Sequence, residues 1–154
     1  MPLSISLEAD PRRKRQLQEQ LTAGLPEWFG QPAANRAYAE QSERLPGYVA
    51  RVDGAPRGLL LLKTHSPVSA EIYWMGVDRA CHHSGIGRAL VEAACAAARQ
   101  DKALFMFVQT LHGRIAYEPY ARTRRFYEAL GFRYMLEAQG TDETNPLALY
   151  RKRL

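Results

Sequence analysis

The chain has 154 residues, of which 46% are hydrophobic and 24% are charged, and its net charge is +5. This length suits one domain with a real core better than two. No apolar run reaches the roughly 20 residues that a membrane helix needs. The N-terminus also has no basic segment followed by a long apolar one. We therefore expect a single domain over residues 1–154, with no membrane partner.

The cysteines and the basic residues narrow the choice of compartment and partner. Cys81 and Cys95 are too few for a disulfide framework, so a reducing cytoplasm is expected. Basic residues cluster at 12–15, 122–125 and 151–153. Aromatic residues do not alternate with them as a single-strand binding platform requires. We therefore favour solvated faces and do not expect nucleic acid as a partner, although a basic nucleic-acid-binding domain stays an alternative.

The first part of the chain predicts a strand, two helices and a hairpin. Leu3, Ile5 and Leu7 alternate with polar residues, and Asp10-Pro11 is a typical helix start. The turn at 53–56 joins two apolar runs as an antiparallel hairpin. The predicted elements are a strand over 3–7, helices over 11–23 and 33–43, and strands over 48–52 and 58–64.

The second part predicts a crossover between parallel strands. A strand, a long alanine-rich helix and a second apolar strand follow one another, and a connection of this kind pairs parallel strands. The predicted elements are strands over 70–77 and 103–108 around a helix over 85–100, then a helix over 120–130 and strands over 132–137 and 147–153. The chain therefore predicts an α/β fold with about seven strands in one mixed sheet and four helices.

A glycine pattern stands where the fourth predicted strand gives way to the long helix. Gly85 and Gly87 lie in the segment His82-His83-Ser84-Gly85-Ile86-Gly87. Glycine lets backbone N–H groups approach an anion, and the helix N-terminus points at it, so a pyrophosphate fits there. Arg88 can add a charge-assisted contact. Taken alone, the pattern is also compatible with a simple helix cap.

Two motifs together resemble the GNAT superfamily of acyl-CoA N-acyltransferases. The loop from His82 to Gly87 is similar to the family pattern [QR]-x-x-G-x-[GA], with His82 departing from it at the Gln or Arg position. The segment Phe126-Tyr127-Glu128-Ala129-Leu130-Gly131-Phe132 resembles the family motif F-Y-x-x-x-G-F. The motifs stand in the family's order and spacing.

The resemblance implies the GNAT fold, with a V-shaped opening between the fourth and fifth strands, and acetyl-CoA as co-substrate. In that family the pantetheine arm hydrogen-bonds to the backbone of the fourth strand. The cofactor-binding residues implied here are Met75, Gly76, Val77, His82, His83, Ser84, Gly85, Ile86, Gly87 and Arg88. An amide near Met75 or Val77 would polarise the thioester carbonyl.

The resemblance also implies an acid and a base for amide formation. Tyr127 matches the tyrosine that protonates the departing sulfur, although its helical face with Thr123 and Leu130 also suits core packing. Glu71 lies six residues before Val77, where some GNAT histone acetyltransferases carry a base that acts through water. A solvated strand glutamate is the alternative.

The acceptor is expected to be an amine whose identity the sequence does not give. Family architecture points to Trp28, Phe29, Glu118 and Tyr120 as acceptor-binding residues, while residues such as Trp28 and Phe29 more often pin a helix corner to the core. We expect no metal, because the adjacent residues 81–83 cannot easily converge on one tetrahedral ion. A non-catalytic acyl-CoA sensor is an alternative function, and a homodimer stays open.

Overall fold

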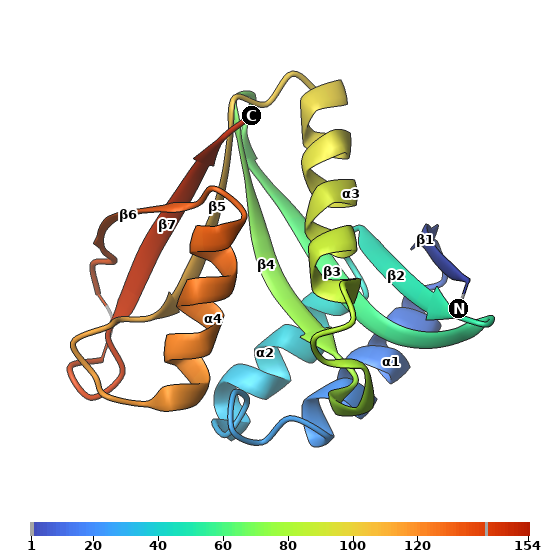
Figure 1. The fold of residues 1–154 in the computed structure, drawn as a ribbon, viewed down its shortest axis with the longest axis horizontal. Coiled ribbons are helices and arrows are strands. Elements are labelled where there is room, and N and C mark those ends of the chain that lie inside the picture. Colours follow the sequence, from blue (N-terminus) through green and yellow to red (C-terminus); the bar gives the residue numbers. More distant parts are fainter. Residues whose placement is uncertain (1, 141) are drawn as a thin grey trace. The chain divides into compact units, whose positions relative to one another are not determined.

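A computed structural model describes residues 2–140 and 142–154, which contain four α-helices and a seven-stranded sheet (Figure 1). The elements are β1 (Leu3–Glu8), α1 (Pro11–Ala23), α2 (Pro32–Ser42), β2 (Gly47–Val52), β3 (Ala55–Ser66), β4 (Ser69–Val77), the short 3₁₀ helix η1 (Arg79–Cys81), α3 (Ile86–Gln100), β5 (Phe105–Leu111), α4 (Glu118–Ala129), β6 (Arg133–Glu137) and β7 (Leu147–Arg153). The strand order is β1-β2-β3-β4-β5-β7-β6. The mixed sheet and its helices confirm the predicted fold class.

Several predicted boundaries were wrong, and strand pairing explains the largest shift. β5 runs to Leu111 instead of ending at Val108, because Gln109, Thr110 and Leu111 continue the antiparallel ladder with β7. β3 begins at Ala55 and ends at Ser66, beyond the predicted range on both sides. Polar residues in paired positions therefore extend strands that an apolar pattern alone makes too short.

Local signals set the ends of several elements. The Asp10 carboxylate accepts hydrogen bonds from the amides of Arg12 (2.9 Å) and Arg13 (3.4 Å), which caps α1. Asp53 and Gly54 take φ values of 50° and 83° in the tight turn between β2 and β3. Gly131 has φ 94° immediately after Leu130, the C-cap residue of α4, and this left-handed conformation ends the helix.

The described residues form two compact units, and the first comprises residues 2–63 and Ile72–Ala97. Its core is a cluster of Leu17 and Leu21 from α1 with Val49, Leu59, Leu61 and Trp74 from the strands. The start of α3 comes close to β3 at Gly58, where a Cβ atom would lie 3.1 Å from both Ile86 Cγ2 and Leu90 Cδ1. The absence of a side chain at residue 58 therefore sets how closely α3 approaches β3.

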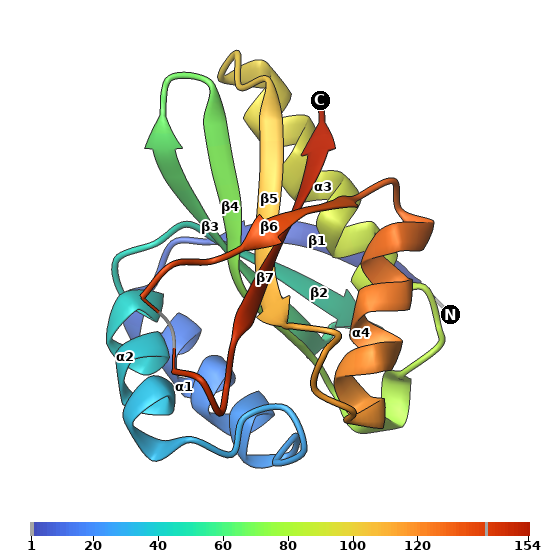
Figure 2. The same ribbon diagram turned by 90° about the vertical axis from the view of Figure 1, so that its left-hand side faces the viewer.

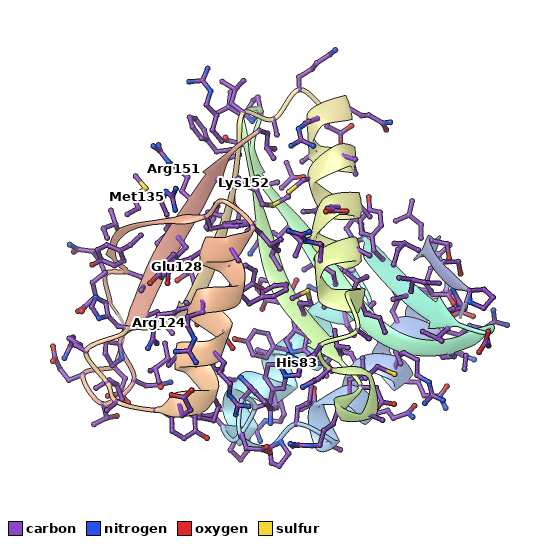
Figure 3. The ribbon with its side chains drawn as sticks, in the orientation of Figure 1. His83, Arg124, Glu128, Met135, Arg151 and Lys152 are labelled. Carbon is purple, nitrogen blue, oxygen red and sulfur yellow. The ribbon has the colours of Figure 1, made fainter. Side chains whose placement is uncertain are left out.

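The second unit comprises Thr64–Glu71 and Ala98–Leu154, residue 141 excepted, and contains β5, β6, β7 and α4 (Figure 2). β7 pairs antiparallel with both β5 and β6. Two labelled basic side chains in Figure 3 anchor its turns: Lys152 Nζ donates to the Leu130 carbonyl and Arg124 Nη1 to the Leu111 carbonyl, both at 2.7 Å. These bonds satisfy carbonyls at the ends of α4 and β5.

Within the part of the chain that the structure describes, no helix is both long and apolar enough to cross a membrane.

Candidate functional site

The segment between β4 and α3 is held by hydrogen bonds among its own residues and by one from Arg57 of β3. The Asp78 carboxylate accepts from the Ala80 amide and from Arg57 Nη1, each at 3.0 Å. η1 follows, and Ser84 Oγ donates to the Cys81 carbonyl. The segment therefore enters α3 along a defined path. We call residues 78–88 the β4–α3 loop.

Two left-handed residues turn the backbone of this loop. His83 has φ 63° and Gly85 has φ 85°, and His83 lies on the exposed part of the loop (Figure 3). The Gly85 carbonyl accepts the Ala89 amide at 3.0 Å and so closes the first turn of α3. The amides of that first turn have no intrahelical acceptor, which makes the turn suited to binding an anion.

Two glycines of the predicted site are needed for different reasons. A Cβ atom at Gly85 would meet nothing within 4 Å, so this residue supplies the positive φ angle and not space. A Cβ atom at Gly76 would lie 2.5 Å from Trp74 Cη2, which is a steric clash. Gly76 therefore leaves room on β4 for the buried ring of Trp74.

His82 binds its own chain at the position where the family pattern has Gln or Arg. A ring nitrogen, Nε2, lies 2.8 Å from the Val77 carbonyl oxygen. Because a carbonyl only accepts, Nε2 carries the hydrogen. The ring also makes an edge contact with Trp28, at 5.8 Å between centroids. The side chain therefore braces the β4–α3 loop. The sequence did not predict this role.

The segment that follows α1 is attached to the same loop. Arg79 Nη2 lies 2.6 Å from Glu27 Oε1 and 3.2 Å from the Gly24 carbonyl, and the guanidinium stands 6.0 Å from the Trp28 ring centroid. Trp28 thus contacts the β4–α3 loop through both Arg79 and His82. Sequence reasoning missed Arg79, because nothing in the pattern around Gly85 points to residues of the earlier segment.

Phe29, the other aromatic residue of that segment, belongs to the core. Its ring stacks on Trp74 at 5.2 Å and 28°, and it makes an edge contact with Tyr38 at 6.5 Å. This matches the alternative in which Phe29 pins a helix corner. The neighbours Trp28 and Phe29 therefore differ in their ring contacts: Trp28 contacts His82 and Arg79 of the β4–α3 loop, and Phe29 contacts Trp74 and Tyr38.

The remaining cofactor candidates of the first unit lie on β4 and at the start of α3. Met75 and Val77 are half-buried on β4, while Gly76 and Ile86 are buried. Arg88 forms an i,i+4 pair with Glu92 at 3.9 Å, but its side chain is 61% exposed. Such a pair contributes little, so the guanidinium can exchange Glu92 for an anionic ligand.

In the second unit, Glu71 lies in a buried polar cluster. The residue is 5% exposed; its Oε1 lies 2.7 Å from His65 Nε2, and its Oε2 accepts from Gln109 Nε2 at 3.3 Å. The His65 ring also contacts Phe107 at 5.0 Å between centroids. Glu71 is therefore not the solvated strand glutamate of the alternative. Sequence reasoning missed His65 and Gln109, since neither belongs to a family motif.

Tyr127 is buried within α4, with 4% of its surface exposed. Its ring packs against Phe126 at 5.1 Å and Phe132 at 5.3 Å. Burial, and to a smaller extent the nearby Tyr120, raise the pKa of the Tyr127 phenol. The phenol therefore keeps its proton at neutral pH and can donate a hydrogen bond. The same ring packing also fits the alternative of a core residue.

The acceptor candidates on α4 lie near the start of the helix. Glu118 pairs with Arg125 at 2.8 Å, and both side chains are largely exposed. Tyr120 is half-buried and its ring lies 6.1 Å from that of Tyr117. Glu118 thus stands in solvent with a cationic neighbour that partly neutralises it.

Within residues 2–140 and 142–154, no group of three or more His, Cys, Asp or Glu residues is arranged to hold a metal ion.

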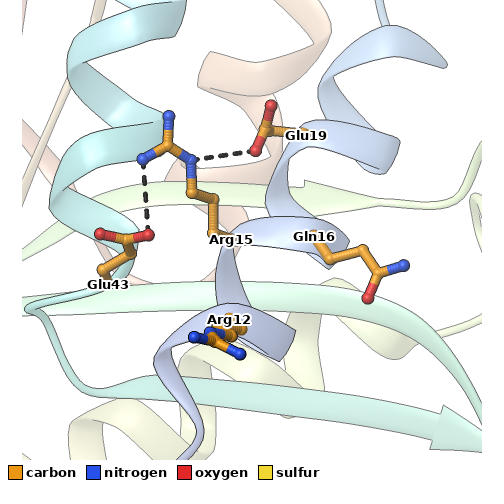
Figure 4. Close-up of a pocket in the computed structure, with 5 residues that line it drawn as sticks. All are labelled: Arg12, Arg15, Gln16, Glu19 and Glu43. Carbon is orange, nitrogen blue, oxygen red and sulfur yellow. Dashed lines mark hydrogen bonds and ion pairs between the residues drawn. The ribbon is translucent and has the colours of Figure 1, made fainter.

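A surface hollow of about 340 Å³ is lined by Arg12, Arg15, Gln16, Glu19 and Glu43 (Figure 4). The hollow is open to solvent, and the ion pairs that Arg15 forms with Glu19 and Glu43 cross part of it. None of the predicted site residues lines it.

The fold and the β4–α3 loop define a class of protein, an α/β protein with a glycine-containing turn at the helix start after the fourth strand of a mixed sheet. The family model of the acetyltransferase (GNAT) domain matches residues 43–134. The chain therefore belongs to the GNAT acetyltransferase family, whose fold binds acetyl-CoA. A search of the curated proteins finds no match.

Solved structures agree in fold over the whole chain. A GNAT-family protein from Desulfovibrio desulfuricans is 20% identical, with a TM-score of 0.83 and 99% of each chain covered. Ard1 from Thermoplasma volcanium is 15% identical with a TM-score of 0.78, covering 100% of this chain and 99% of that one. The PaiA N-acetyltransferase from Thermoplasma acidophilum, solved in complex with coenzyme A, is 15% identical with a TM-score of 0.72, covering 98% and 99%.

Proposed function

We propose that the chain, acting as one domain over residues 1–154, is an N-acetyltransferase that transfers the acetyl group of acetyl-CoA directly to an amine. The observation that carries the proposal is the β4–α3 loop, whose positive φ angles at His83 and Gly85 precede the first turn of α3. This loop belongs to a chain of the GNAT acetyltransferase family. Similar structures named N-acetyltransferases support the amine as acceptor.

In this proposal the loop binds the diphosphate of acetyl-CoA mainly through its backbone. Amides from Ser84 to Arg88 hydrogen-bond the diphosphate, and the exposed Arg88 adds a charge. The backbone of Met75, Gly76 and Val77 accepts hydrogen bonds from the pantetheine arm and donates hydrogen bonds to it. His82 acts on the cofactor indirectly, because its ring holds the Val77 carbonyl.

Tyr127 is the proposed donor to the sulfur that leaves. A thioester carbon that accepts an amine must release a thiolate, and the thiolate is stabilised by a proton or a hydrogen bond. The raised pKa of the Tyr127 phenol keeps it protonated. While the ring stays buried, that pKa favours donation of a hydrogen bond over complete transfer of the proton.

Glu71 is the proposed base, acting through water. A lysine-like amine is only about 0.1% neutral near pH 7, which corresponds to roughly 4 kcal/mol that a base must help to offset. The buried carboxylate of Glu71, already held by His65 and Gln109, has a fixed position for this task.

The acceptor region is proposed to include Trp28, Glu118 and Tyr120, next to Phe29, whose ring stacks on Trp74 in the core. The aromatic rings suit an apolar part of the amine substrate, and Glu118 suits its positive charge. The partners are thus acetyl-CoA and an amine, in the cytoplasm. A homodimer is compatible with this proposal.

Two measurements test the proposed function. Acetyl-CoA at about 100 times its Kd is expected to stabilise the protein by about 2.7 kcal/mol, seen as a rise in Tm. Thiol release from acetyl-CoA is then measured with amino acids, polyamines, aminoglycosides, peptides and arylalkylamines. Binding without CoA release above background from any of these would favour the acyl-CoA sensor. Binding to neither acetyl-CoA nor CoA would contradict both readings.

A further inference from the structure

The cluster of His65, Glu71 and Gln109 holds one carboxylate between two side chains. Glu71 Oε1 lies 2.7 Å from His65 Nε2, and Glu71 Oε2 accepts from Gln109 Nε2 at 3.3 Å. An ionised carboxylate has no proton to give, so Nε2 is the donor in the shorter contact. In the neutral imidazole the second ring nitrogen, Nδ1, then carries a lone pair that can accept a proton.

Exposure separates the two members of the pair. The Glu71 side chain is 7% exposed, whereas 35% of the His65 side chain is exposed. A proton from bulk water or from an amine therefore reaches the imidazole more readily than the carboxylate. Phe107, which contacts the ring, and Gln109, which contacts Glu71, carry no charge, so Glu71 is the titratable contact of the ring. Across the ladder, Arg151 of β7 is the cation paired in register with Phe107, and it stands over the Phe105 ring.

On this basis we propose that His65 is the group that accepts the proton in the acetyl-transfer reaction, and that the basic role of Glu71 is exerted through His65, whose ring its carboxylate positions. The inference rests on the proposed function and names the group that accepts the proton lost by the amine. The arrangement of a base oriented by a buried carboxylate is one that enzymes use for proton abstraction. Histidine is also the side chain whose ordinary charge change falls near neutral pH.

Nδ1 of His65 takes one proton from the ammonium form of the acceptor, directly or through a water, and becomes part of an imidazolium whose Nε2–H faces the Glu71 carboxylate. The neutral amine forms the C–N bond as the C–S bond breaks, and CoA leaves as a thiolate stabilised by the Tyr127 phenol. The nitrogen then carries two hydrogens: one is lost through solvent to the sulfur, the other stays as the amide N–H, and the imidazolium returns its proton to water.

The test compares His65→Ala with His112→Ala. His112 also faces a glutamate in the same unit, with Nε2 3.8 Å from Glu137 Oε1, so it is a matched control outside the proposed site. With acetyl-CoA and the fastest amine of the panel above, we expect His65→Ala to lower kcat/KM by roughly a hundredfold. The rise of kcat/KM with pH near neutrality should disappear, and added imidazole should restore part of the rate. His112→Ala should match the wild type.

A second readout does not depend on turnover. Side-chain ¹H–¹⁵N spectra should show the Nε2–H form of His65 in the wild type and a mixture of forms in Glu71→Gln, which no longer requires a donor at that position. The rise of Tm with acetyl-CoA should be the same in wild type and His65→Ala.

Each outcome decides between the hypotheses. Wild-type turnover with unchanged rate and pH profile in His65→Ala would overturn this inference alone. So would a loss of rate that imidazole does not restore and that leaves the pH profile unchanged, which indicates a structural role. Absence of CoA release by the wild type would overturn the proposed function and, with it, this inference.

Discussion

The β4–α3 loop and the cluster of His65, Glu71 and Gln109 serve the proposed reaction in different ways. The loop offers main-chain amides, placed by the φ angles of His83 and Gly85. The cluster offers side chains, placed by strand positions and by hydrogen bonds of 2.7 and 3.3 Å. A site made of amides tolerates a departure such as His82 at a motif position, whereas a site made of side chains depends on the identity of each one.

The largest effect is expected from Tyr127→Phe, which removes a side-chain donor and leaves the loop intact. Turnover should fall roughly 10² to 10³-fold, the range typical of a lost hydrogen-bond donor to a developing negative charge, while the Kd for acetyl-CoA stays within about twofold. Steady-state thiol release and titration calorimetry measure the two quantities. Tyr134→Phe on the exposed strand β6 is the control. A kcat within threefold of the wild type would assign Tyr127 to core packing alone.

The same tyrosine predicts a change of stability at alkaline pH. Burial raises the folded-state pKa of Tyr127 above the ordinary value of about 10. The unfolded chain therefore loses the proton first, so stability is full below about pH 10 and falls above it by about 1.4 kcal/mol per pH unit. Urea unfolding between pH 8 and 11 should show a steeper loss for wild type than for Tyr127→Phe. Parallel curves would show that the phenol is accessible to solvent when folded.

Substituting Gly85 tests the backbone side of the comparison, and Gly54 provides a matched control. Both glycines have φ near +85°, at 85° and 83°, and a Cβ atom at either meets nothing within 4 Å. Each alanine variant should lose about 1–2 kcal/mol of stability for its left-handed backbone. Only Gly85→Ala should also weaken acetyl-CoA binding, by roughly tenfold. Equal affinities in the two variants would remove the loop from the binding site.

The smallest effect is expected at His82, whose ring holds the Val77 carbonyl and so, in the proposed function, acts on the cofactor indirectly. His82→Ala removes the hydrogen bond to the Val77 carbonyl, so stability should fall by about 1 kcal/mol, and the Kd for acetyl-CoA should rise by no more than about fivefold. His82→Gln keeps a donor and should lie closer to the wild type. A loss above a hundredfold with unchanged stability would instead show direct contact with the cofactor.

The same contrast explains how much could be predicted from the sequence. Glycine pattern and apolar periodicity predicted the sheet, the four helices and the β4–α3 loop, because these features depend on local backbone preferences. The cluster could not be predicted, since it needs the relative register of β3, β4 and β5, which no local pattern contains. Trp28 and Phe29 show the same limit: adjacent aromatic residues differ in their contacts because the turn after α1 points them in different directions.

Gly76 and Trp74 restrict the order in which this strand can be changed. Any side chain at residue 76 collides with an indole that is itself 3% exposed and has little room to move. A substitution at Gly76 is therefore harmful on its own and becomes acceptable only after Trp74 has been replaced by a smaller residue. In a directed-evolution experiment on this strand, Trp74 would have to be substituted before Gly76. A library that varies residue 76 alone would contain only variants with a steric clash against Trp74.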